Sequence, residues 1–159
     1  AASALADSES VLFGQGVHRW VVGFSGGVDS TALLHWLSHL SDRLPILALH
    51  VNHQLDPDAH YWAEAASNFS ASLGIDYRMV SVDVASGGSV EAAARAAGYA
   101  AFEAVLGPAD LLILGHHADD QVETVVMNML RGSERPGLQG MPSDRVVGQA
   151  TLVRPFLKV

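Results

Sequence analysis

Short apolar runs that alternate with helical patterns constrain the fold of this chain more than any other feature. Residues 20–24, 45–51 and 110–115 are largely apolar, as is typical of buried strands, and residues 77–84 alternate as a strand does. Helical patterns occupy residues 31–37, 56–73, 89–106 and 118–131. Strands that alternate with helices predict parallel βαβ units. We therefore expect an α/β fold with an open, mostly parallel sheet and helices on both faces.

The last third of the chain is less regular. Residues 151–154 predict a fifth short strand, whereas residues 132–148 are rich in Gly, Pro and Ser and show no clear element. A loop of that length is too long for a passive connection inside a compact domain. We interpret it as a mobile lid over a bound substrate, with an ordinary surface connector as the alternative.

A six-residue segment of the chain, which we call the hexamer, joins the first strand to the first helix: Ser25-Gly26-Gly27-Val28-Asp29-Ser30. A glycine pair lets the backbone adopt positive φ and approach a ligand closely. The amides of such a turn and the helix dipole form an anion cradle, which suits phosphate. Asp29 is compatible with an anion there when Mg²⁺ carried by a nucleotide lies between them. An ordinary turn with Asp29 as the helix N-cap is the alternative, and a Walker A loop is excluded because no Lys follows the glycines.

Composition narrows the class of protein. The chain has 159 residues, 49% of them hydrophobic, which is enough for one domain with its own core. No apolar run approaches the length of a membrane span, and the N-terminus lacks the basic region of a secretory signal. The absence of cysteine excludes Cys-ligated zinc and iron–sulfur clusters and, with a nucleotide site, favours a cytoplasmic location. The net charge of −8 argues against non-specific nucleic-acid binding by the whole chain.

Polar side chains gather where the predicted strands end. His50, Asn52 and His53 follow the second strand, and a His116-His117-x-Asp119-Asp120 segment follows the fourth. Ligands of open α/β sheets bind outside the carboxyl ends of the strands, so we expect these clusters to meet the hexamer. For His50 and Asn52, which share one face of an extended segment, hydrogen bonding to local backbone is the alternative to ligand binding.

The acidic residues of the second cluster suit a hard metal ion, because Mg²⁺ takes carboxylates together with phosphate oxygens. We expect one of Asp119 and Asp120 to cap the following helix and the other to face the nucleotide, with Glu123 and Thr124 extending that face. Adjacent histidines on a strand point to opposite faces, so a closed zinc site at His116 and His117 is not favoured.

The basic residues leave two interpretations open. Arg95 either forms an i,i+4 ion pair with Glu91 or reaches the nucleotide. Arg145 and Arg154 belong to a basic region in the last 30 residues that forms either a phosphate-binding edge or ordinary surface charge.

The hexamer resembles the PP-loop of the ATP pyrophosphatase superfamily, in which ATP is cleaved between the α- and β-phosphates and a substrate oxygen is adenylated. In sequence order, further motifs make the chain similar to the N-terminal domain of the tRNA(Ile)-lysidine synthetases. These motifs are residues 50–53, 91–95, 115–124, 131–133 and 154–157, together with Gly-Leu-x-Gly-Met at 137–141. The resemblance covers nearly the whole chain.

The resemblance implies a Rossmann-like PP-loop domain over residues 1–159 and an ATP-dependent ligase. Lysine would be joined to C2 of the wobble cytidine of an isoleucine tRNA through an adenylated cytidine, with release of AMP and pyrophosphate. By position, Asp29 and Asp120 would serve Mg²⁺-bound phosphates, and His116 and Arg95 would support adenylate formation. The residues expected to contact ATP are Ser25, Gly26, Gly27, Val28, Asp29, Ser30, His50 and Asn52.

The implied partners are the tRNA(Ile) anticodon loop and lysine, with no membrane; the oligomeric state is left open, a homodimer included. Since the family continues past the position of Val159, we expect a catalytic-domain fragment without C-terminal RNA-binding parts. The chain departs from the family where His53-Gln54-Leu55-Asp56 replaces His-Gly-Leu-Arg and where Gly98-Tyr99 replaces Arg-Tyr. Both changes remove basic charge.

Two other functions are compatible with the same motifs. One is another PP-loop ATP pyrophosphatase acting on tRNA or a small molecule, although related tRNA thiolases use cysteines, which this chain lacks. The other is a nucleotide-binding module without catalysis, because a fold does not determine a function.

Overall fold

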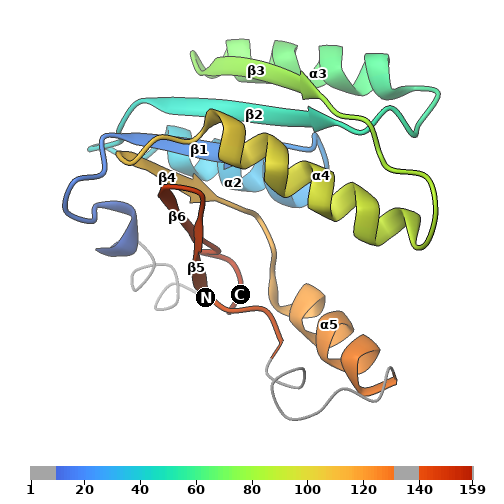
Figure 1. Ribbon diagram of the computed structural model, residues 1–159. Coiled ribbons are helices and arrows are strands. Elements are labelled where there is room, and N and C mark those ends of the chain that lie inside the picture. Colours follow the sequence, from blue (N-terminus) through green and yellow to red (C-terminus); the bar gives the residue numbers. More distant parts are fainter. Residues whose placement is uncertain (1–9, 131–139, 159) are drawn as a thin grey trace.

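The computed structural model describes residues 10–130 and 140–158. Their six strands form one sheet in the order β3-β2-β1-β4-β6-β5 (Figure 1). The strands are β1 (Arg19–Gly23), β2 (Ile46–Asn52), β3 (Asp76–Ser81), β4 (Asp110–Ile113), β5 (Asp144–Val147) and β6 (Ala150–Val153). All neighbours pair in parallel except β5 and β6, so the prediction of a mostly parallel sheet is confirmed.

Helices cover both faces of the sheet, as predicted. One hydrophobic cluster joins it to α2 (Val28–Ser38) and α3 (Ala59–Ser72), and a second joins the opposite face to α4 (Val90–Val105). Helix α5 (Ala118–Leu130) extends away from the sheet and has no buried residue (Figure 1). No helix within the described ranges is long and apolar enough to cross a bilayer.

The two central strands are the most deeply buried. Trp20, Val21 and Val22 of β1 and Leu112 and Ile113 of β4 are fully inaccessible to solvent. Side chains of a strand alternate between its two faces, so each apolar run supplies both clusters at once. This explains why the sequence of these strands is continuously apolar rather than alternating.

The structure differs most from the sequence prediction at the hexamer and in the region 132–148. Helix α2 begins at Val28 and not at residue 31, so the second half of the hexamer is helical. The region 132–148, expected to lack elements, contains β5, which pairs with β6 through a two-residue turn. Gly148 has a φ of 58° in that turn, the conformation that short hairpins require. Pairing with β6 makes Asp144–Val147 a strand, and that pairing is invisible to local pattern.

The burial of β4 makes a direct prediction about stability. We expect Leu112→Ala to lower the free energy of unfolding by about 2–5 kcal/mol, because the side chain is fully buried and leaves a cavity. Leu130→Ala is the matched control, since that leucine is 78% exposed, and its effect should stay within about 0.5 kcal/mol. Urea unfolding measures both. Equal losses would show that β4 does not form the core.

Candidate functional site

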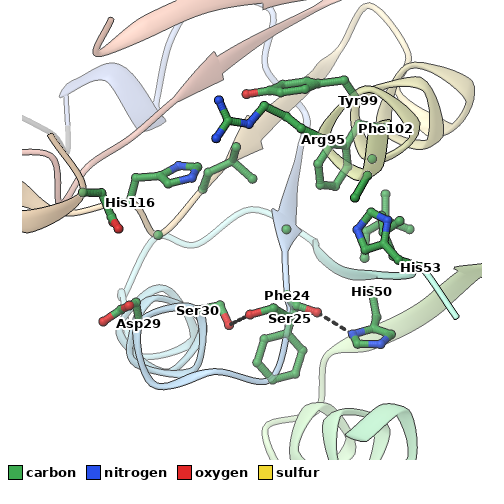
Figure 2. A pocket seen from close by; sticks show the side chains of 18 of the residues that line it. Phe24, Ser25, Asp29, Ser30, His50, His53, Arg95, Tyr99, Phe102 and His116 are labelled. Carbon is green, nitrogen blue, oxygen red and sulfur yellow. Dashed lines mark hydrogen bonds between the residues drawn. The ribbon is translucent and has the colours of Figure 1, made fainter. Parts of the chain in front are cut away.

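A cavity of about 940 Å³ opens at the carboxyl ends of β1, β2 and β4 (Figure 2). Strand β1 pairs with β2 on one side and with β4 on the other. The order in which strands follow along the sheet therefore reverses at β1, and the cavity lies at this reversal. Ligands of open α/β sheets bind at this switch point. The polar lining residues include Ser25, Asp29, Ser30, His50, Asn52, His53, Arg95, Tyr99, His116, Asp120, Glu123, Thr124, Arg145 and Arg154.

Ser25, Asp29 and Ser30 of the hexamer line the floor of this cavity, beside an open helix N-terminus, whereas Gly26, Gly27 and Val28 do not line it. Gly27 is the N-cap of α2 and no side chain caps the helix, so Asp29 is not the N-cap. The serine hydroxyls are 3.1 Å apart, Ser25 Oγ accepts the Gly27 N–H, and Ser30 Oγ donates to the Gly27 carbonyl. A helix N-terminus without a side-chain cap presents free amides and a positive dipole end to an anion. The residues thus fit a phosphate.

The two glycines of the hexamer have different roles. Gly26 adopts a φ of 86°, which a side chain disfavours, whereas Gly27 has an ordinary φ of −72°. Positive φ therefore favours glycine at position 26 and not at position 27. Gly115, after β4, matters for another reason: a Cβ there would lie 3.2 Å from the carbonyl carbon and oxygen of Asp29. This close approach sets His116 and His117 beside the first turn of α2.

His117 lies between the two carboxylates predicted to bind a metal. Its Nε2 is 3.4 Å from Asp29 Oδ2, and its Nδ1 is 3.9 Å from Asp120 Oδ2. Asp120 also accepts the His117 N–H at 2.9 Å, while His117 Nδ1 accepts the Asp119 N–H at 3.2 Å. This is a reciprocal cap at the start of α5. We expected one aspartate to cap the helix and the other to face the nucleotide, and this is wrong. Asp120 both caps α5 and lines the cavity, whereas Asp119 is exposed.

These carboxylates fit Mg²⁺ by donor chemistry. Asp29 is 55% exposed at the anion cradle, and Asp120 faces the same cavity. Mg²⁺ usually keeps several waters and binds one or two carboxylates plus substrate phosphates. The described residues form no group of three or more His, Asp or Glu side chains that could hold a metal alone. Phosphate oxygens of a bound nucleotide would have to complete the coordination.

The polar residues at the end of β2 and just after it form hydrogen bonds to nearby backbone and also line the cavity. His50 is buried and donates from Nδ1 to the Phe24 carbonyl at 2.9 Å, tying β2 to the end of β1. Asn52 Oδ1 accepts the Gln54 N–H. Gln54 has a φ of 56°, and the family that the chain resembles has glycine at this position. His53 packs over Gly98, whose added Cβ would lie 3.5 Å from the ring. The side-chain oxygen of Asn52 is thus committed to its turn.

His53 also carries a buried nitrogen, Nδ1, that has no hydrogen-bond partner among the described residues. Burial lowers the pKa of His53 from its usual value, and the neighbouring His50 lowers it further. Because this nitrogen is itself buried, leaving it without a partner costs free energy. The sequence placed His53 in the polar cluster but supplied no reason to expect this orphan nitrogen.

Opposite the hexamer, the wall of the cavity is cationic and aromatic. Figure 2 shows Arg95 and Tyr99 across the cavity from Asp29 and Ser30. Arg95 lies 3.4 Å from Glu91 as an exposed ion pair, so that interpretation is confirmed. The side chain also lines the cavity, and its contact with a nucleotide stays a prediction. The guanidinium of Arg145 stacks 4.8 Å from the centre of the Tyr99 ring. This wall suits a second anionic or aromatic group of a ligand.

Arg154 and His116 complete this wall. Arg154 is only 5% exposed and donates from Nε to His116 Nδ1 at 3.3 Å. The expectation of ordinary surface charge for Arg154 is therefore wrong, because the side chain is buried. Arg154 also lines the cavity, so its place in a phosphate-binding edge stays a prediction. Burial lowers the pKa of His116, and Arg154 lowers it further.

The predicted lid can be followed in part. Residues 131–139 lie outside the described residues, so its first half stays a prediction. The second half is attached: Met141 exchanges two hydrogen bonds with the Gln121 side chain of α5, at 2.6 and 2.7 Å. Gly140, Met141 and Pro142 line the cavity.

Comparison with known proteins places this geometry in a family. A family described as the PP-loop domain matches residues 3–159. Proteins named tRNA(Ile)-lysidine synthase are 48% identical over 143 residues in Pseudomonas syringae and Pseudomonas aeruginosa and 46% identical over 142 residues in Alkalilimnicola ehrlichii. The matches cover 87–88% of this chain but 32% of each relative, so the chain spans about a third of their length.

A solved structure, the U34-tRNA thiolase NcsA from Methanococcus maripaludis with its [4Fe-4S] cluster, shares the fold. It has 20% sequence identity and a TM-score of 0.70, covering 99% of this chain and 59% of that one. At this identity the likeness shows the fold alone.

The conformations of the two glycines predict different effects on ATP binding. We expect Gly26→Ala to weaken ATP binding roughly tenfold, because a side chain disfavours the left-handed conformation by about 1–2 kcal/mol and the loop relaxes away from the cradle. Gly27→Ala should weaken it less, roughly threefold at most, since its φ is ordinary and a Cβ meets Ser25 Oγ at 3.4 Å. Calorimetric titration with ATP measures both, and a larger effect at Gly27 would contradict this assignment.

The burial of His116 predicts a pH dependence of stability. Its pKa in the folded protein lies below the unfolded value of about 6.5, so the unfolded state binds more protons between those two values. The free energy of unfolding should therefore fall as the pH drops from about 6.5 through the folded pKa. Urea unfolding across this range should show a smaller fall for His116→Gln, with the remainder due to His53, whose pKa is also lowered. Identical pH dependence in both proteins would contradict the burial of a neutral ring.

Proposed function

This chain belongs to the PP-loop domain family, and from that premise we propose that it is the ATP-binding catalytic domain of a tRNA(Ile)-lysidine synthase. The reaction is the ATP-dependent joining of lysine to C2 of the wobble cytidine of an isoleucine tRNA. The observation that carries the proposal is the open N-terminus of α2, which faces a cavity walled on its other side by Arg95 and Tyr99, with His116 beside the helix. The names of relatives that are 46–48% identical support the choice of substrate.

In this proposal, different parts of the cavity hold the two ends of the triphosphate. The amides of α2 and the hydroxyls of Ser25 and Ser30 hold the phosphates that leave as pyrophosphate. Arg95 lies across the cavity and His116 beside the first turn of α2, and together they stabilise charge on the α-phosphate. When bound, Mg²⁺ held by Asp29 and Asp120 neutralises phosphate charge.

In the first step, the C2 oxygen of the cytidine attacks the α-phosphorus, and the bond to the β-phosphate oxygen breaks. In the second step, the amine of lysine attacks C2, the C2–oxygen bond breaks, AMP leaves with that oxygen, and the amine loses a proton. The protein forms no covalent bond in this scheme. Its contribution is alignment of the reactants and stabilisation of charge.

The alternative PP-loop activities have less support in this chain. Thiolation of tRNA with a cysteine-bound iron–sulfur cluster would need ligands that the chain does not contain, since it has no cysteine. A nucleotide-binding module without catalysis would use the same cradle, so an experiment must separate it from the ligase.

The test is lysine transfer by the complete protein that contains this chain. With ATP, labelled lysine and an isoleucine tRNA bearing a wobble cytidine, we expect lysine incorporation together with release of AMP and pyrophosphate. The same tRNA with a wobble uridine is the control and should remain unmodified. ATP binding without pyrophosphate release from the cytidine tRNA would support the non-catalytic module.

The cradle makes a sharper prediction at Asp29. We expect Asp29→Asn to reduce tRNA-dependent pyrophosphate release at least roughly 100-fold, because loss of a charged ligand to a phosphate-bound metal removes several kcal/mol of charge stabilisation. The fold should persist, since this side chain is 55% exposed. Asp119→Asn is the matched control at the neighbouring helix terminus and should retain activity within about twofold. Full activity of Asp29→Asn would exclude the metal role.

A further inference from the structure

Arg154 is a buried cation whose three hydrogen-bonding partners are all neutral acceptors. Nε donates to His116 Nδ1 at 3.3 Å, Nη1 to the Pro142 carbonyl at 2.7 Å, and Nη2 to the Tyr99 hydroxyl at 3.1 Å. No carboxylate of the described residues forms an ion pair with it. A buried charge without an opposite charge destabilises a protein. The placement of Arg154 therefore calls for a role other than stability.

The bond to His116 determines where that ring carries its proton. A guanidinium is always protonated and only donates hydrogen bonds, so Nδ1 of His116 must be the acceptor. An imidazole nitrogen that accepts has no hydrogen, and in the neutral ring the proton is then on Nε2. The described residues form no hydrogen bond to Nε2, and His116 lines the cavity. Burial and the charge of Arg154 keep the pKa of His116 low, in agreement with a neutral ring.

We propose that Arg154 is a positioning residue that holds His116 as the neutral Nε2–H tautomer, so that His116 offers the cavity a hydrogen-bond donor and not a base. A neutral N–H donor in this wall suits an anionic oxygen of the ligand. Its assignment to an oxygen on the α-phosphate rests on the proposed function. The tautomer itself does not.

The surroundings of Arg154 hold the guanidinium in one orientation. Tyr99 comes from α4 and Pro142 from the segment before β5, so the planar group is fixed from two sides of the cavity. The backbone N–H of Arg154 donates to the Ser143 carbonyl, which fixes the main chain as well. Arg145 stacks on the ring of Tyr99, which accepts the hydrogen bond from Nη2 of Arg154. A lysine could not reproduce this three-way fork with one ammonium group.

The tautomer can be read directly by ¹⁵N–¹H correlation of the histidine rings at about pH 8, well above the usual histidine pKa. His116→Gln identifies the His116 signals. In the wild-type chain we expect the Nε2–H form in roughly tenfold or greater excess, as a hydrogen bond from a charged donor implies. A wild-type spectrum in which His116 carries its proton on Nδ1, or populates both forms equally, would overturn the proposal.

Two variants separate positioning from general packing. Arg154→Lys should shift His116 towards a mixture of tautomers, because the Nε–H donor is lost while the charge is kept. Tyr99→Phe removes the acceptor of Nη2 but not the Nε bond, and it should leave the Nε2–H form dominant. An unchanged His116 spectrum in Arg154→Lys would contradict the proposal. The wild-type spectrum decides the tautomer even where a variant does not fold.

Kinetics of the complete protein give a second readout that rests on the proposed function. For Arg154→Lys we expect kcat for pyrophosphate release to fall at least roughly tenfold while KM for ATP stays within about threefold, since the cradle at α2 is untouched. A rise in KM alone would assign Arg154 to substrate binding instead. Absence of pyrophosphate release from the wild-type protein would refute the proposed function and leave the tautomer assignment standing.

Discussion

The pairing of β1 with β4 at the centre of the sheet is the interaction on which the rest of the structure depends. Four residue pairs, from Arg19 with Asp110 to Val22 with Ile113, hold these strands in parallel register. Parallel strands end at the same edge, so the hexamer after β1 and the His116-His117 segment after β4 emerge side by side. Gly115 then allows the second segment to touch the first turn of α2. The candidate site residues after β1, β2 and β4 are placed by these strands, whereas Arg95 comes from α4.

The cavity that results is polarised. Its floor is an open helix N-terminus with two serine hydroxyls, and carboxylates flank this floor on either side of His117. The opposite wall contains Arg95, Arg145 stacked on Tyr99, and buried Arg154. A ligand with phosphates at one end and a second polar or aromatic group at the other matches this division. The proposed reaction, in which a triphosphate meets a nucleobase, needs such an arrangement.

Much of the fold was predictable because the relevant signals are local. Continuous apolar runs marked β1, β2 and β4, and each proved to be a buried parallel strand. The strand β5 was not predictable, since Asp144–Val147 is exposed at three of its four residues and becomes a strand only by pairing with β6. The start of α2 at Val28 was missed because serine and aspartate look like turn residues, although they are also usual in the first turn of a helix.

For the site, the sequence by itself determined which residues reach the carboxyl edge of the sheet: the hexamer, the residues after β2 and the residues after β4. It also indicated the family, which the match over residues 3–159 confirmed. Only the tertiary structure decided the backbone conformation, the neighbours and the hydrogen-bond partners of those residues. It separated Gly26 from Gly27 by backbone conformation and set His117 between Asp29 and Asp120. It also showed that Arg154, for which the sequence left a phosphate-binding edge and surface charge open, is a buried donor to His116. The physical reason is that strand periodicity and turn composition are properties of neighbouring residues. The partner of a buried polar group, in contrast, is chosen by packing between segments 38 residues apart, as for Arg154 and His116.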